Sequence, residues 1–269
     1  MKIMKSLIVS FVIISSLLAI GGINFTRAAD FVASEEKTEL KISREQTARN
    51  LFAAGETVNI EAKEIRKDLF VAGKTLFIDT TIENNVFVAG ETVNVKGKIG
   101  GNLFALAQTL IISAEIEGDI FALGADIYLE DGSHVLGDIY SGSGKLHLKG
   151  RIIGDVSAAS SDALVEGSIL GTLNLKVENS LKISSGAIIQ ELNYSSPNEA
   201  LIEEGAEVRK KTYTPVVSSD KSKKGRGYFA GVFTGFKLID WLSSLILAFL
   251  FLAFLKKPCL TVFFAFVII

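Results

Sequence analysis

The sequence predicts an all-β fold, a parallel β-helix of about nine coils between residues 49 and 209. Two observations lead to this prediction. One pattern recurs at steps of 17 to 19 residues: an Asn or Asp, an apolar residue directly after it, and further apolar residues near offsets eight, ten and fourteen. Within each repeat, apolar residues alternate with other residues in three short runs, a period typical of strands and not of helices.

Each repeat is expected to form one coil of three short strands that pair with the equivalent strands of the next coil. At about 4.8 Å per coil, nine coils give a rod about 40 Å long. The apolar residues at offset one point inward and stack into a continuous core: Leu51, Leu69, Val86, Leu103, Ile120, Ile139, Val156, Leu173 and Leu192. Glycine at offset five, as in Gly55 and Gly73, is expected to allow a left-handed corner.

The first position of the repeats forms what we call the Asx column: Asn50, Asp68, Asn85, Asn102, Asp119, Asp138 and Asp155, continued more weakly by Thr172 and Glu191. Short polar side chains favour a corner because they bond the local backbone, and Asn side chains also form ladders between stacked coils. A calcium site is the other interpretation. Several members are neutral Asn and the spacing of calcium-binding repeats is absent, so no metal site and no cofactor is predicted.

Offset two carries an aromatic residue in six successive repeats, which we call the aromatic stripe: Phe52, Phe70, Phe87, Phe104, Phe121 and Tyr140. Alternation points these rings outward, where they would form an apolar patch larger than a typical monomer exposes. Such a stripe would contact another rod, a partner or lipid. The alternative is that the inward and outward positions are reversed and the rings belong to the core.

Composition excludes several classes of protein. Cys259 is the single cysteine, which excludes a disulfide framework and a multi-cysteine metal site. Residues 29–220 hold 18 basic and 29 acidic groups, a net charge of −11. A segment this acidic is a poor ligand for nucleic acid. His134 and His147 are the only histidines, and both are expected to be solvated surface residues.

The N-terminal segment, residues 1–28, reads as an export signal. Lys2 and Lys5 precede an apolar run, and small residues end at Ala28. An uncleaved anchor is the alternative. Residues 29–48 are expected to lead into the first coil or to cap it.

The C-terminal part is predicted to attach the chain to a membrane. A basic linker, residues 210–237, precedes 238–255, whose 18 residues as a helix span about 27 Å. Residues 259–269 resemble the start of a second membrane helix that is cut short. An export signal places the β-helix on the extracytoplasmic side of the cell membrane. A basic cluster before the helix favours the cytoplasmic side or contact with anionic headgroups: Lys221, Lys223, Lys224 and Arg226.

The repeat resembles the bactofilins and related polymer-forming cytoskeletal proteins, and is most similar to a membrane-attached branch with an export signal. The similarity is carried by Asp68–Gly73, Asn85–Val95, Gly118–Gly124, Gly137-Asp138, Gly154-Asp155, the closing segment 196–206 and Lys256-Lys257-Pro258. The resemblance implies a right-handed, three-sided β-helix that assembles head to head without nucleotide. The signal and the membrane segments depart from the cytoplasmic members.

These observations favour a non-enzymatic structural protein that self-associates end to end or laterally, with no small-molecule substrate. The alternative is a binding module whose aromatic stripe docks a glycan or a protein. An acyltransferase is disfavoured because the repeat is not a strict 18 residues. A carbohydrate-active enzyme needs clustered carboxylates in a cleft, and Asp119, Asp138 and Asp155 lie at a tight corner without long loops.

Overall fold

The computed structural model describes residues 29–33, 39–43, 47 and 49–216. The predicted signal segment, the basic cluster and both predicted membrane helices lie outside the described residues. No helix with the length and apolar character needed to cross a membrane occurs among the residues that the structure describes.

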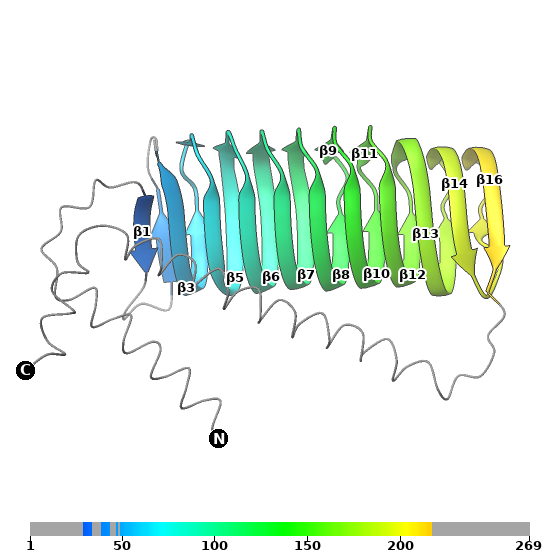
Figure 1. Cartoon of the computed structure of the whole chain (residues 1–269), viewed down its shortest axis with the longest axis horizontal. Coiled ribbons are helices and arrows are strands. Elements are labelled where there is room, and N and C mark those ends of the chain that lie inside the picture. Colours follow the sequence, from blue (N-terminus) through cyan, green and yellow to red (C-terminus); the bar gives the residue numbers. More distant parts are fainter. Residues whose placement is uncertain (1–28, 34–38, 44–46, 48, 217–269) are drawn as a thin grey trace, which may run out of the picture. The chain divides into compact units, whose positions relative to one another are not determined.

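The described residues form a parallel β-solenoid of about ten turns (Figure 1). Its strands join one 16-stranded sheet in which every pairing is parallel. The strands are β1 (Ala29–Ala33), β2 (Glu39–Ile42), β3 (Asn50–Ile60), β4 (Glu64–Ile65), β5 (Leu69–Ile82), β6 (Val86–Ile99), β7 (Leu103–Ile116), β8 (Ile120–Leu129), β9 (His134–Val135), β10 (Ile139–Leu148), β11 (Arg151–Ile152), β12 (Val156–Val165), β13 (Ser168–Ile183), β14 (Ile188–Ser196), β15 (Leu201–Ile202) and β16 (Glu207–Pro215).

The register follows the predicted repeat. Strands β5 and β6 pair from Leu69 with Val86 to Ile82 with Ile99, a constant step of 17 residues. The register shifts between Ser160 and Asp162, where β12 pairs with β13 and a coil gains a residue. The drift of the step between 17 and 19 therefore reflects local irregularities of single coils.

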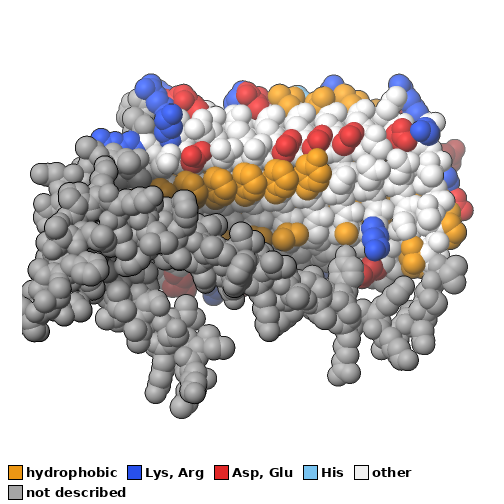
Figure 2. Space-filling model, viewed as in Figure 1, with side chains coloured by type: hydrophobic (Ala, Val, Ile, Leu, Met, Phe, Trp, Pro, Cys, Tyr) orange, Lys and Arg blue, Asp and Glu red, His pale blue; other side chains and the backbone are white. Residues whose placement is uncertain are grey.

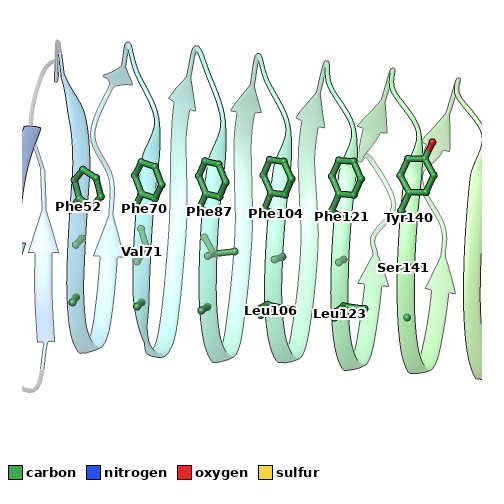
Figure 3. A pocket seen from close by; sticks show the side chains of 18 of the residues that line it. Phe52, Phe70, Val71, Phe87, Phe104, Leu106, Phe121, Leu123, Tyr140 and Ser141 are labelled. Carbon is green, nitrogen blue, oxygen red and sulfur yellow. The ribbon is translucent and has the colours of Figure 1, made fainter. Parts of the chain in front are cut away.

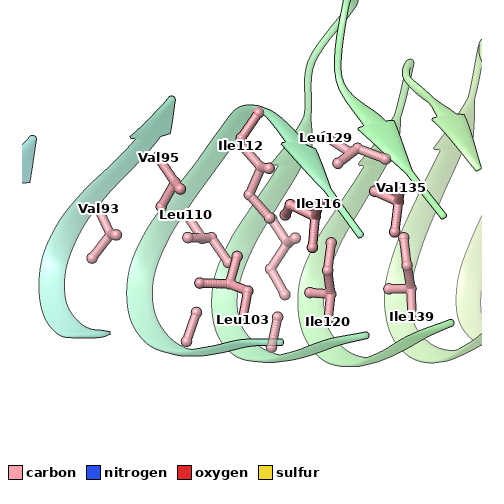
Figure 4. Packing of buried hydrophobic residues seen from close by; sticks show 14 of the residues in the cluster. Val93, Val95, Leu103, Leu110, Ile112, Ile116, Ile120, Leu129, Val135 and Ile139 are labelled. Atoms are coloured by element: carbon pink, nitrogen blue, oxygen red, sulfur yellow. The ribbon is translucent and has the colours of Figure 1, made fainter. Parts of the chain in front are cut away.

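A dry core fills the solenoid, as predicted. The offset-one residues from Leu51 to Leu192 are all buried, and residues from the second and third runs meet them inside (Figure 4). In two neighbouring coils these residues are Val93, Val95, Leu110, Ile112 and Ile116. Because each inward side chain stacks on its equivalent one coil away, the core is one continuous column of apolar side chains.

The solenoid extends beyond the predicted boundaries at both ends. Strands β1 and β2 pair with β3, so the segment expected to lead into or cap the first coil contributes strands of its own. Strand β16 pairs with β14 and takes in the first residues of the predicted linker. The sequence repeat hides both terminal coils because Ala29 lies 21 residues before its partner Asn50, and because β16 has few apolar residues.

The Asx column forms a ladder of seven hydrogen bonds from coil to coil. In each, an Asn or Asp Oδ1 accepts from the backbone N–H of the equivalent residue in the next coil, starting with Asn50 and Asp68 and ending with Asp155 and Thr172. The donor–acceptor distances run from 3.2 Å at the first step to 2.6 Å at the last. The ladder satisfies backbone donors at a corner that the sheet cannot reach.

Glycine directly before the Asx position makes room for this ladder. A Cβ at Gly137 would lie 2.5 Å from the Asp119 Oδ1 and would also meet a carbonyl of the previous coil. Where this glycine is present, from Gly101 onward, the ladder bonds are 2.9 Å or shorter. The two bonds without it, at Asp68 and Asn85, are 3.2 and 3.1 Å.

The prediction of left-handed corners at offset five is wrong. The described glycines with positive φ are Gly97, Gly132, Gly186 and Gly205, and none lies at this offset. A Cβ at Gly90 would instead stand 2.8 Å from the carbonyl oxygen of Gly73 in the previous coil. Glycine is needed there because two backbones approach closely.

Replacing Gly137 by Ala tests the role of this glycine. Its Cβ meets backbone and a ladder oxygen, neither of which is a flexible side-chain end, so the ladder bond must lengthen. We expect the free energy of unfolding to fall by about 1–3 kcal/mol, measured by urea denaturation of the full chain in detergent.

Gly142→Ala is the matched control. Its Cβ would meet only the end of the Leu123 side chain, at 3.0 Å, which can move aside. We expect a change within about 0.5 kcal/mol. Equal losses in the two variants would contradict the assignment of Gly137 to the ladder.

Candidate functional site

The aromatic stripe forms a continuous stack of rings along one side of the solenoid (Figure 3). Phe31 of β1 extends it by one ring, and the name includes Phe31 from here on. Neighbouring ring centroids lie 4.4 to 5.1 Å apart, and the ring planes are within 2 to 16° of parallel. In-register pairing of the strands produces this stack, because it places each ring directly over its equivalent in the previous coil.

The rings lie on the outer face and not in the core. Each stripe position follows one buried residue and precedes another, as Phe87 does between Val86 and Val88, except that Tyr140 precedes the half-buried Ser141. The first rings, from Phe52 to Phe104, are half-buried by their neighbours, and Phe121 and Tyr140 are exposed. Of the two interpretations of the alternation, the outward one is therefore the one that holds.

A long apolar trough runs beside the stripe, with a volume of about 1010 Å³. The stripe forms one wall and the residues at offset three form the floor. The opposite wall consists of the outward residues at offset four: Ala54, Ala72, Ala89, Leu106, Leu123 and Gly142. This wall is low in the first coils, where it is alanine. It is raised at Leu106 and Leu123, which are 56% and 58% exposed.

The same side of the solenoid becomes polar in its C-terminal coils. The stripe position is occupied there by Ser157, Asn174, Asn193 and Thr212, and the trough continues as a shallower, polar hollow of about 550 Å³. The Asn193 side-chain amide donates to the Asn174 Oδ1 at 3.2 Å. Since the same fold accepts Ser, Asn and Thr at this position, the aromatic rings are not required by the coil.

Acidic side chains of the Asx column flank the stripe, and Figure 2 shows acidic side chains in a row beside the hydrophobic row. The Tyr140 hydroxyl donates to the Asp138 Oδ2 at 3.3 Å. The charge of Asp138, this hydrogen bond and the nearby Asp119 and Asp155 raise the pKa of Tyr140 above its ordinary value. Tyr140 therefore stays neutral, and the rim of the trough carries negative charge.

The stacked geometry limits what the stripe can bind. Each ring covers the faces of its neighbours, so only ring edges point toward the trough. A sugar ring or a cation binds an aromatic face, and internal stacking occupies those faces. Ring edges contact aliphatic side chains or the faces of other aromatic rings, so the surface suits an apolar protein surface.

The two histidines do not contribute to the trough. His147 Nε2 lies 2.6 Å from Glu166 Oε2, and its ring contacts Tyr128 edge to face. His134 lies in β9, where its Nε2 has no hydrogen-bond partner. Both side chains are half-buried, not freely solvated as predicted. No group of three or more His, Cys, Asp or Glu residues within the described ranges is arranged to hold a metal ion.

The stripe could be found from the sequence, but the trough could not. The wall at offset four varies between Ala, Leu and Gly, so it gives no repeat signal, and Phe31 falls in the coil that the repeat search misses. A test for outward positions that are small beside a conserved bulky column would have found the trough.

Substitutions at Asp119 test whether the acidic column is structural. Asp119→Ala removes the acceptor for the Asp138 backbone N–H and leaves that part-buried donor unpaired. We expect the free energy of unfolding to fall by about 1–3 kcal/mol, measured by urea denaturation. Asp119→Asn keeps an Oδ1 acceptor, as Asn85 and Asn102 do, and should unfold like the parent chain. A large loss with Asn as well would show that the ladder needs the charge.

Comparisons of the chain with known proteins give no result that bears on the site. No family model, curated protein or solved structure matches the chain. The function therefore has to be argued from the solenoid and from the surfaces described here.

Proposed function

We propose that this chain is a non-enzymatic structural protein, a bactofilin-like rod held at the cell membrane that organises copies of itself or partners there. In this proposal the solenoid is right-handed and three-sided and lies on the extracytoplasmic side. The signal segment and the membrane helices predicted from the sequence supply the export and the attachment.

The observation that carries the proposal is that the core is uncovered at both ends of the described solenoid. Inward residues of the middle coils are buried, but those of the terminal coils are only partly buried. At the N-terminal end these are Val32 and Leu40, and at the C-terminal end they include Val208 and Tyr213. A second solenoid stacked on either end would bury these side chains and extend the sheet.

The two ends differ in how well they are protected. Strand β16 carries Lys210 and Lys211, which pair with Glu191 and Glu199, and it ends at Pro215. Lysine and proline are the residues that natural proteins place on edge strands to prevent further pairing. Strand β1 is ADFVA, with neither. We therefore expect the N-terminal end to make the stronger contact.

The chemistry of the described residues supports a structural role more than a catalytic one. The carboxylates that would be needed for sugar hydrolysis accept ladder hydrogen bonds through Oδ1. The large trough is lined by apolar side chains with Tyr140 as its one titratable group. A binding module is the second candidate, and the stacked rings favour a protein over a glycan as its ligand.

Charged substitutions at the uncovered ends test the proposal. The full chain in detergent should form assemblies longer than one solenoid as concentration rises, seen by light scattering and electron microscopy. Leu40→Glu places a charge in the N-terminal end contact and should remove most of these assemblies. Val208→Glu should have the smaller effect, because β16 is already protected.

Single solenoids at every concentration and salt level would rule out end-to-end assembly. Leu170→Glu serves as the control, since Leu170 is an exposed leucine away from the ends and the trough. This variant should assemble like the parent chain. Loss of assembly in all three variants would point to a general effect of added charge.

A further inference from the structure

We propose that the aromatic stripe and the trough are an interface for a second copy of this chain, with two solenoids side by side and running in the same direction. This inference deepens the proposed structural function and rests on it, because it names the surface and the geometry by which copies associate laterally. It is independent of contact through the ends.

The surface is self-complementary because a raised row and a hollow lie next to each other. The stripe is the raised row, and the alanines at offset four form the low part of the hollow. A two-fold axis parallel to the solenoid places the stripe of each copy in the trough of the other. Both copies have the same spacing between coils, so the fit repeats along the whole stripe.

The size of the patch is sufficient for a dimer. Phe31 is 77% exposed, and Leu106, Leu123, Phe121 and Tyr140 are between 37% and 58% exposed. At roughly 200 Å² for a large apolar side chain, the stripe and the two leucines expose on the order of 600 Å². A standard interface buries about 800 Å² on each partner, and the exposed trough alanines supply much of the difference.

The charges at the two rims favour the parallel orientation. One rim is the Asx column, and the other follows the trough. With the axis parallel to the solenoid, each Asx residue faces the other rim of the same coil in the second copy: Asp68 faces Lys74, Asn85 faces Glu91 and Asp138 faces Lys145. An antiparallel pair would instead place Asx column against Asx column, with carboxylates opposite one another.

Parallel pairing also agrees with the predicted attachment to a membrane. It places Pro215 of both copies at the same end of the pair. The predicted membrane helix, 238–255, follows in each chain, so two chains inserted in one membrane can both reach their helices. An antiparallel pair would place the two Pro215 residues at opposite ends.

Single cysteines in the trough wall test both the interface and its direction. In the full chain with Cys259→Ser, we would place cysteine at Ala54, Ala89 or Leu123, all exposed and evenly spaced along the trough. Membranes holding each variant are treated with a bismaleimide of about 10 Å. Four coils, about 19 Å, separate position 54 from position 123, so the linker cannot join them in a parallel pair.

A parallel dimer should link each of the three positions to itself. Linkage of position 89 to itself, together with linkage of 54 to 123 in mixed membranes, would show an antiparallel pair and overturn the proposed orientation. Leu170→Cys, exposed on another part of the surface, sets the background. If all three positions link no more than this control while a monofunctional maleimide labels them fully, the trough is not an interface.

Charged variants separate this interface from the ends. Leu106→Glu with Leu123→Glu should weaken the lateral dimer by roughly tenfold or more and leave end-to-end assembly intact. Leu40→Glu should do the reverse and leave the crosslinks at 54, 89 and 123 unchanged. Crosslinks that persist in the double-glutamate variant would overturn the lateral interface alone, and loss of long assemblies in Leu40→Glu bears only on the ends.

Discussion

The constraint on which the rest of the structure depends is the in-register stacking of equivalent residues. Because every strand pairs in parallel with its equivalent one coil away, a side chain always rests on the same kind of side chain. A column of one residue type therefore behaves as a unit. The inward apolar columns become the core, the Asx column becomes a ladder of hydrogen bonds, and the outward aromatic column becomes a stack of rings.

The same constraint explains which substitutions the columns accept. In the Asx column, Asn and Asp alternate freely, because the ladder uses only one side-chain oxygen from each residue. Thr172 ends the ladder, since its backbone N–H accepts no replacement role as a donor to a further coil's side chain and Glu191 follows with a longer side chain. The carboxylates are therefore one of two equivalent ways to supply an acceptor. Their charge is left free to serve the surface, at the rim of the trough.

The sequence was sufficient to predict the coils, the core and the outward stripe, because each is a column repeated in six or more coils. It was insufficient where a column is short or its members differ. The terminal coils escaped because the step to Ala29 is 21 residues and β16 is mostly polar. The reason for glycine at Gly73 and Gly90 was wrong because the contact that excludes a Cβ comes from a residue one coil away, which no local turn rule considers.

The division of one side into an apolar and a polar half has a physical consequence for association. Coil stability depends on the inward columns, and these continue unchanged from Leu103 to Leu192 while the outward column changes from Phe to Ser and Asn. The outward column therefore contributes little that the fold requires. Exposed aromatic side chains carry a solvation cost that the polar coils avoid at no loss of structure. A contact that covers the stripe accounts for that cost, and the abrupt change at Ser157 then marks where the contact ends.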